Sequence, residues 1–194
     1  MTDRKATGAR DLVDVVAAAV DAGLPAVQLR EKDLSGRALF VLAERLRVVT
    51  ARAGALLLVN ERVDVAIAAG ADGVHLGGGS MPVHVARRLL PAHAIVGVST
   101  HSAAEVAAAT ADFAFFGPVY ATPSKASAQG VAPLRAAVVV GRIPVLAIGG
   151  VTVERVAEVR RAGAAGVAVI RAILAAPDPA AATRALLDAL AERP

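Results

Sequence analysis

The feature that most constrains the fold is a series of short apolar runs that alternate with longer amphipathic segments. The runs show no alternation of polar and apolar residues, which is typical of strands buried on both faces, as in a parallel sheet. Seven such runs occur, at residues 26–30, 55–59, 73–76, 95–98, 113–116, 144–148 and 166–170. The pattern therefore predicts a serial β/α array.

The segments between the runs have apolar residues at helical spacing. Helices are expected at residues 9–22, 36–53, 63–69, 83–90, 103–109, 133–140, 153–162 and 179–190. Ser35, Ser102 and Thr152 stand where N-cap residues belong. An Ala-Gly pair precedes an apolar run at 22–23, 53–54, 69–70 and 162–163, which indicates a helix end followed by a glycine turn.

Two architectures accommodate this array, a doubly wound sheet and a (β/α)8 barrel. The barrel needs an eighth strand, and the only room for it is before Asp3, so Met1–Asp3 would be its stub. We expect an α/β fold, a single (β/α)8 TIM barrel with a truncated or near-absent first strand. No linker interrupts the array, so residues 1–194 are expected to form one domain.

Composition excludes several classes of protein. With 56% hydrophobic residues the chain is not disordered, and no long uncharged apolar run indicates a membrane span. The net charge is +4, but the arginines are dispersed and aromatic residues make up 3%, so nucleic-acid binding is not expected. The absence of cysteine and of an apolar leader at the start favours a cytoplasmic location.

Polar or glycine-rich residues follow every expected strand, whereas the residues at the strand starts show no such pattern. In a barrel the strand carboxyl ends hold the active site. Arg30, Lys32 and Lys125 would then meet at one mouth, with backbone donors from the glycines at 77–79 and 149–150. A second anion site is expected around Gly150 and Arg171. Two anion sites indicate two phosphorylated small substrates, or one long one.

Several segments resemble the thiamine-phosphate synthase and thiazole tautomerase family, in order and over nearly the whole chain. They are QLREK (28–32), NERVDVA (60–66), GADGVHLG (70–77), GVSTHS (97–102), FGPVYATPSK (116–125), IPVLAIGGV (143–151) and AGAAGVAVI (162–170). The resemblance implies a (β/α)8 barrel and a transferase of thiamine biosynthesis. That reaction joins a pyrimidine-methyl diphosphate to a thiazole phosphate and releases diphosphate.

The resemblance also implies roles for individual residues. The pyrimidine diphosphate would be held by Gln28, Arg30, Lys32, Asn60, Ser99 and Lys125, with Arg30 and Lys125 as catalytic residues that stabilise the departing charge. The thiazole phosphate would be held by Thr122, Ser124, Gly150, Ile170 and Arg171.

The family binds Mg²⁺ on the departing diphosphate, and its acidic metal positions fall on Glu61 and Ser80. A serine hydroxyl is a poor substitute for a carboxylate on Mg²⁺, and Ser80 is also interpreted as an N-cap for a helix beginning near Pro82. The thiazole tautomerase branch, with His101 or Glu61 as general acid or base, and a non-catalytic ligand-binding relative are the alternatives. A homo-oligomer is left open.

Overall fold

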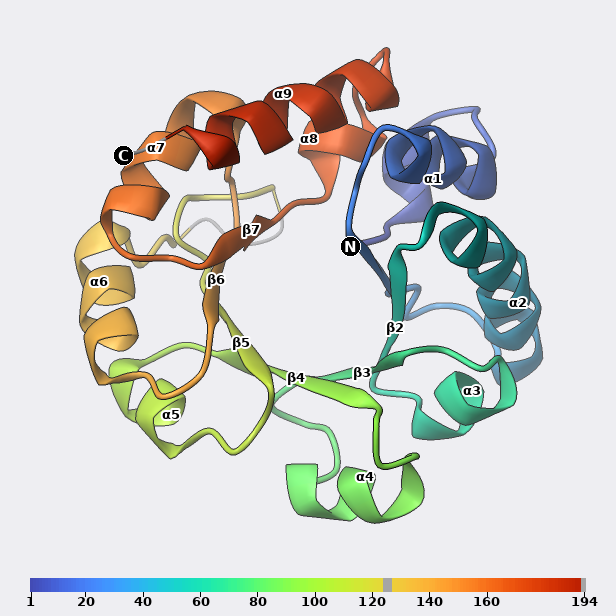
Figure 1. Cartoon of the computed structure of the whole chain (residues 1–194), viewed down its shortest axis with the longest axis horizontal. Helices are drawn as coiled ribbons and strands as arrows, with labels where there is room; N and C mark the ends of the chain where they lie inside the picture. Colours follow the sequence, from blue (N-terminus) through green and yellow to red (C-terminus); the bar gives the residue numbers. More distant parts are fainter. Residues whose placement is uncertain (124–126, 193–194) are drawn as a thin grey trace. The chain divides into compact units, whose positions relative to one another are not determined.

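The computed structural model describes residues 1–123 and 127–192. In that part of the chain, strands alternate with helices as the apolar runs predict (Figure 1). The strands are β1 (Ala26–Leu29), β2 (Leu56–Asn60), β3 (Gly73–Leu76), β4 (Ile95–Thr100), β5 (Phe113–Phe116), β6 (Val145–Ile148) and β7 (Gly166–Ala168). The helices are the 3-10 helix η1 (Arg4–Thr7), α1 (Leu12–Asp21), α2 (Gly36–Ala53), α3 (Val63–Ala68), α4 (Val83–Leu89), α5 (Ala103–Ala108), α6 (Val131–Val140), α7 (Val153–Arg161), α8 (Arg171–Leu174) and α9 (Pro179–Ala191).

The strands follow one another in the sheet in chain order, from β1 to β7. The pairs β1–β2, β2–β3, β4–β5, β5–β6 and β6–β7 are parallel. All four residues of β3 are buried, and β2 is buried at Leu57, Leu58 and Val59. Burial on successive residues is the reason that these strands lack an alternating sequence pattern.

The chain divides into two compact units. Unit 1 comprises Met1–Leu76, Ser80–Val96 and Ile170–Arg184, and unit 2 comprises Gly77–Gly79, Gly97–Val169 and the residues from Ala185 on. Figure 1 shows α2 and α3 flanking β2 in unit 1, and α5 and α6 flanking β5 and β6 in unit 2.

The N-terminal residues of unit 1 lie beside β1. The Thr2 N–H donates to the Gln28 carbonyl at 2.8 Å, and the Arg30 N–H donates to Thr2 Oγ1 at 2.8 Å. Asp3 is extended and then caps η1 by accepting from the Lys5 N–H at 3.1 Å. The truncated first strand is therefore a short extended segment hydrogen-bonded to β1.

Most helix boundaries agree with the sequence prediction. Ser35 and Ser102 are N-caps whose hydroxyls accept from the Ala38 and Glu105 N–H groups, at 3.3 and 3.2 Å. Gly54 ends α2 in the left-handed conformation, at φ 68°. Helix α1 starts at Leu12 and not at residue 9, because Asp11 provides the cap by accepting from the Val13 N–H at 2.8 Å.

Two further elements differ from the prediction. Helix α6 begins at Val131, ahead of Pro133, because proline is tolerated in the first turn of a helix. Helix α8, of four residues, was not predicted, since so short an apolar stretch after β7 carries no helical period. No helix in the described part of the chain combines the length and apolar character that crossing a membrane requires.

Candidate functional site

Gln28 and Asn60 meet at the carboxyl ends of β1 and β2, where the sequence predicts a binding site. Gln28 is 4% exposed, and its Nε2 donates to Asn60 Oδ1 at 3.0 Å. The Gln28 Oε1 is buried and has no hydrogen-bond partner among the described residues. A buried acceptor without a partner costs about 1–3 kcal/mol. This acceptor is therefore suited to a ligand that brings its own donor.

The cations of the QLREK segment lie just beyond β1. Lys32 Nζ lies 3.9 Å from Glu61 Oε1; the Lys32 side chain is exposed and Glu61 is half-buried. Arg30 is half-buried, and no carboxylate of the described residues pairs with its guanidinium. An arginine held at a strand end without a carboxylate is available to an anion.

Glu31 and Asp33 do not pair with Arg30 or Lys32, although they are their neighbours in sequence. Arg4 forms ion pairs with both acids: its Nη1 lies 3.0 Å from Glu31 Oε2 and 2.6 Å from Asp33 Oδ1. The Arg4 guanidinium lowers the pKa of Asp33 well below its usual range, first by hydrogen bonding. These acids therefore hold the N-terminal segment and pair with neither Arg30 nor Lys32.

Glu61 is the one predicted metal position that carries a carboxylate. Its φ is 63°, unusual for a residue with a side chain, and its N–H donates to the His75 carbonyl at 2.9 Å. The neighbouring structure thus overrides the local preference of Glu61, as is common at functional sites.

The described residues only partly fit a Mg²⁺ ion. Within residues 1–123 and 127–192, no group of three or more His, Cys, Asp or Glu side chains could hold a metal. Helix α4 begins after Pro82, so the interpretation of Ser80 as its N-cap is wrong. Mg²⁺ is commonly bound by one or two carboxylates together with substrate phosphates. Glu61 fits that arrangement as a single carboxylate ligand.

The residues of unit 1 that are predicted to contact the thiazole phosphate follow β7. Ile170 is the N-cap residue of the short helix α8, and its carbonyl accepts from the Leu174 N–H at 2.9 Å. Arg171 is the first residue of this helix and is exposed.

In unit 2, Ser99 and His101 stand at the end of β4. Ser99 is half-buried. The His101 N–H donates to Glu105 Oε2 at 2.7 Å, and His101 Nδ1 lies 2.5 Å from the Gly117 carbonyl oxygen. Because a carbonyl only accepts, Nδ1 carries the proton in this contact, and a neutral His101 keeps Nε2 as an acceptor.

The Gly149–Gly150 turn of unit 2 packs directly on residues 118–121. Their φ values are 96° and 61°, and a Cβ at Gly149 would lie 2.6 Å from Pro118 Cα. A Cβ at Gly150 would lie 2.7 Å from the Ala121 carbonyl oxygen. The Val119 N–H donates to the Ile148 carbonyl at 2.8 Å and the Tyr120 N–H to the Gly149 carbonyl at 3.0 Å. Only glycine meets both demands at these positions.

Of the other predicted contacts in this loop, Thr122 is half-buried, two residues beyond Tyr120. Ser124 and Lys125 lie outside the described residues.

Sequence analysis missed a cluster behind this turn. Arg155 of α7 donates from Nη1 to the Gly150 carbonyl at 2.6 Å, and its guanidinium carbon lies 4.4 Å from the centre of the Tyr120 ring. The Tyr120 hydroxyl donates to Glu158 Oε2 at 2.6 Å. Burial and then the Glu158 carboxylate raise the pKa of Tyr120 to about 12. Only the helical spacing of Arg155 and Glu158 hinted at a shared face.

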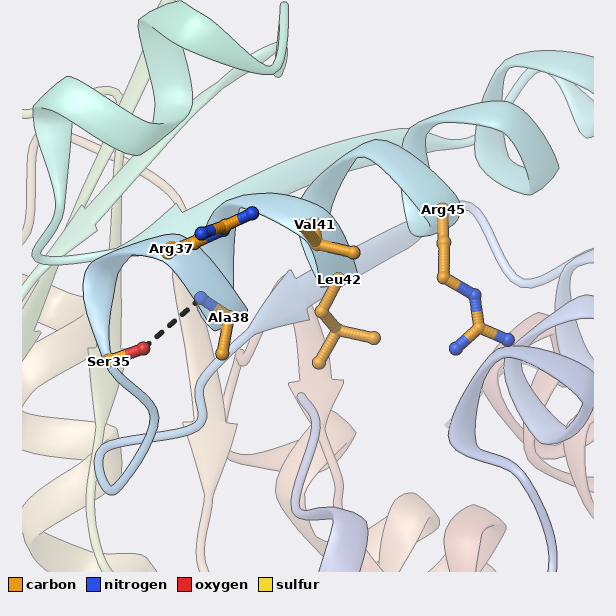
Figure 2. A pocket seen from close by; sticks show the side chains of 6 residues that line it. All are labelled: Ser35, Arg37, Ala38, Val41, Leu42 and Arg45. Carbon is orange, nitrogen blue, oxygen red and sulfur yellow. Dashed lines mark hydrogen bonds between the residues drawn. The ribbon is translucent and has the colours of Figure 1, made fainter.

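A separate groove runs along the outer face of α2 in unit 1, with a volume of about 400 Å³. Figure 2 shows Arg37 and Val41 on this helix, with the Ser35 hydroxyl capping its start. The groove contains none of the predicted site residues; it is lined by Ser35, Arg37, Ala38, Val41, Leu42 and Arg45.

A parallel β/α array with cations, a buried amide and glycine turns at its strand ends is typical of a barrel enzyme that acts on small phosphorylated molecules. The family model for thiamine monophosphate synthase matches residues 1–173. The thiamine-phosphate synthase of Roseiflexus castenholzii is 47% identical, over 100% of this chain and 87% of its own. That of Methanoculleus marisnigri is 44% identical, over 98% of this chain and 93% of its own.

Solved structures agree with these relatives. Thiamine phosphate pyrophosphorylase from Pyrococcus furiosus superimposes with a TM-score of 0.89 at 36% identity, covering 97% of this chain and 92% of that one. The chain belongs to the thiamine monophosphate synthase family. The predictions of a (β/α)8 barrel fold, of this family and of an enzyme of the thiamine-phosphate synthase kind are confirmed.

Proposed function

We propose that the chain joins 4-amino-2-methyl-5-(diphosphomethyl)pyrimidine to thiazole phosphate, forming thiamine phosphate and diphosphate. The family membership supports this transfer reaction. The structural observation that carries the proposal is the buried Oε1 of Gln28, which has no partner in the described part of the chain. It lies beside Asn60, at the strand end that Arg30 and Lys32 follow.

The pyrimidine substrate is complementary to this corner of unit 1. Its amino group is a donor, and the Gln28 Oε1 is an acceptor that no described residue satisfies. Asn60 holds the Gln28 amide by accepting from its Nε2, so the acceptor keeps its direction. The diphosphate then extends toward Arg30 and Lys32. Ser99 and Lys125 are proposed as further contacts on this substrate.

The reaction breaks the bond between the substrate methylene carbon and the diphosphate oxygen, and that electron pair leaves with diphosphate. The thiazole nitrogen then donates its lone pair to the methylene carbon, so a C–N bond replaces the C–O bond. No side chain must move a proton in these steps. Arg30 and Lys125 are proposed to stabilise the negative charge that develops on the leaving oxygen.

Mg²⁺, when bound, would neutralise charge on the departing diphosphate. Glu61 is proposed as its protein ligand, since it supplies the carboxylate that Ser80 lacks. Replacing Glu61 by Gln should raise the Mg²⁺ concentration for half-maximal activity about tenfold, because one charged ligand is lost. An unchanged Mg²⁺ dependence would remove Glu61 from the metal site.

The thiazole phosphate is proposed to bind at the Gly150 turn, with Thr122, Ser124, Ile170 and Arg171 as further contacts. Gly150 supports this because its positive φ of 61° allows a tight turn directly after β6, and backbone N–H groups in such turns can bind anions. The single domain over residues 1–194, the cytoplasmic location and a homo-oligomer stay predictions.

The test measures both substrates and both products with purified protein and Mg²⁺. Wild type should form thiamine phosphate, and Arg30→Gln should lower kcat/KM at least about 100-fold, since a charge-assisted contact to the leaving group is lost. Arg37→Gln, on the exposed face of α2, is the matched control and should stay within about twofold. Conversion of the thiazole tautomer with no coupling would instead select the isomerase alternative.

A further inference from the structure

The cluster behind the Gly149–Gly150 turn joins two loops of unit 2 through one face of α7. Arg155 and Glu158 are three residues apart, so they project from neighbouring positions on this helix. Between them lies Tyr120, whose ring faces the Arg155 guanidinium and whose hydroxyl donates to Glu158. The arginine is thereby held over the ring by a cation–π contact and reaches the Gly150 carbonyl.

This contact restrains the direction of the Gly150 carbonyl. In a trans peptide the carbonyl and the following N–H point in opposite directions. A Gly150 carbonyl held by Arg155 therefore directs the Val151 N–H away from the Arg155 guanidinium. Glycines are the residues with the widest range of backbone conformations, so a turn of two glycines needs such an external restraint.

We infer that Arg155, Tyr120 and Glu158 are positioning residues that hold the Gly150 turn in the orientation that binds a phosphate ester. The inference rests on the proposed function, because it takes the phosphate to be that of the thiazole substrate. None of the three side chains touches the reacting atoms in this assignment. They act through Gly150, and they determine affinity for one of the two substrates.

A second contact between the two loops also involves Tyr120. The Tyr120 N–H also donates to the Gly149 carbonyl at 3.0 Å, so the tyrosine contacts the turn with its backbone and the arginine with its ring. Displacing the ring would loosen the Gly150 carbonyl that Arg155 holds, and would leave the backbone bond to the Gly149 carbonyl in place. The side chain and the backbone of one residue thus restrain both peptide groups.

Kinetics with each substrate varied separately test the inference. Arg155→Gln should raise KM for thiazole phosphate about five- to tenfold, the loss expected for one hydrogen bond from a charged donor at an exposed position. KM for the pyrimidine diphosphate and kcat should stay within about twofold. Tyr120→Phe, which keeps the ring and loses the bond to Glu158, should give a smaller rise. Arg161→Gln, at the exposed end of α7, is the matched control and should match wild type.

Titration calorimetry with thiazole phosphate alone gives a readout independent of turnover. Arg155→Gln should weaken binding by the same factor as it raises KM. If wild type is active or binds the ester but the variant binds equally well, the inference fails and the proposed function stands. If both KM values rise together, the cluster is merely structural, and the inference fails. A wild-type chain that neither forms thiamine phosphate nor binds thiazole phosphate overturns both.

Discussion

Replacing Gln28 by Leu separates binding from folding at the corner of unit 1. The substitution removes the bond from Gln28 Nε2 to Asn60, worth about 1 kcal/mol. It also removes a buried acceptor without a partner, which relieves about 1–3 kcal/mol. Asn60 is half-buried and can turn to solvent. We expect the free energy of unfolding to rise by about 1 kcal/mol, or to stay the same.

The catalytic activity of the Gln28→Leu variant, in contrast, should fall. A leucine offers the pyrimidine amino group no acceptor, so kcat/KM for the pyrimidine diphosphate should fall about 100-fold. Urea denaturation measures the first quantity, and initial rates measure the second. A more stable and less active variant is the expected combination.

A matched control exists at Thr50, whose buried hydroxyl does have a partner, the Arg47 carbonyl at 3.2 Å. Thr50→Val should lower the free energy of unfolding by about 1 kcal/mol and leave kinetics unchanged. If Gln28→Leu instead loses more than about 2 kcal/mol of stability, Gln28 serves the fold and the assignment of its Oε1 to a ligand is wrong.

Three further predictions concern other contacts. Gly149→Ala should lower the free energy of unfolding by about 2 kcal/mol or more, because its φ is positive and a Cβ would clash with Pro118. Gly54→Ala, which has open space at φ 68°, is the control and should lower it by about 1 kcal/mol; thermal denaturation measures both. Arg4→Ala should lower the midpoint of thermal denaturation, because it leaves the buried Glu31 carboxylate without its cation. Asp33→Ala, which removes an exposed acid, should lower this midpoint less. Tyr120 is the only tyrosine and there is no tryptophan, so ultraviolet absorbance should show one phenol titrating near pH 12. Because this pKa is raised from 10.0 in the folded state, the contribution of Tyr120 to stability is complete below pH 10 and is lost as pH rises to 12. A titration midpoint at pH 10 would contradict the Tyr120–Glu158 contact.

The sequence predicts the strand array well because burial on both faces leaves a local signal. Residues 73–76 and 113–116 were predicted to the residue, as was helix α2 between its Ser35 cap and Gly54. Helix α8 and the start of α1 were not, because a four-residue helix has no period and because Ala9 continues the apolar helical spacing beyond the Asp11 cap.

The candidate site, like the fold, was predicted only in part. Gln28 and Asn60 were predicted as site residues through the family resemblance, and the structure, in which they lie in β1 and β2, brings their side chains within 3.0 Å. The pairing of Arg4 with Glu31 and the cluster of Tyr120, Arg155 and Glu158 join residues 27 to 38 positions apart. Such contacts depend on tertiary packing and leave no local pattern in the sequence.

The central claim is that this chain forms a C–N bond between two phosphorylated substrates as diphosphate departs. Phosphorus NMR of one reaction mixture, with both substrates and Mg²⁺, tests it most directly. We predict that inorganic diphosphate and thiamine phosphate rise together in a one-to-one ratio. Diphosphate release without thiamine phosphate, or no change with a folded protein, would contradict it.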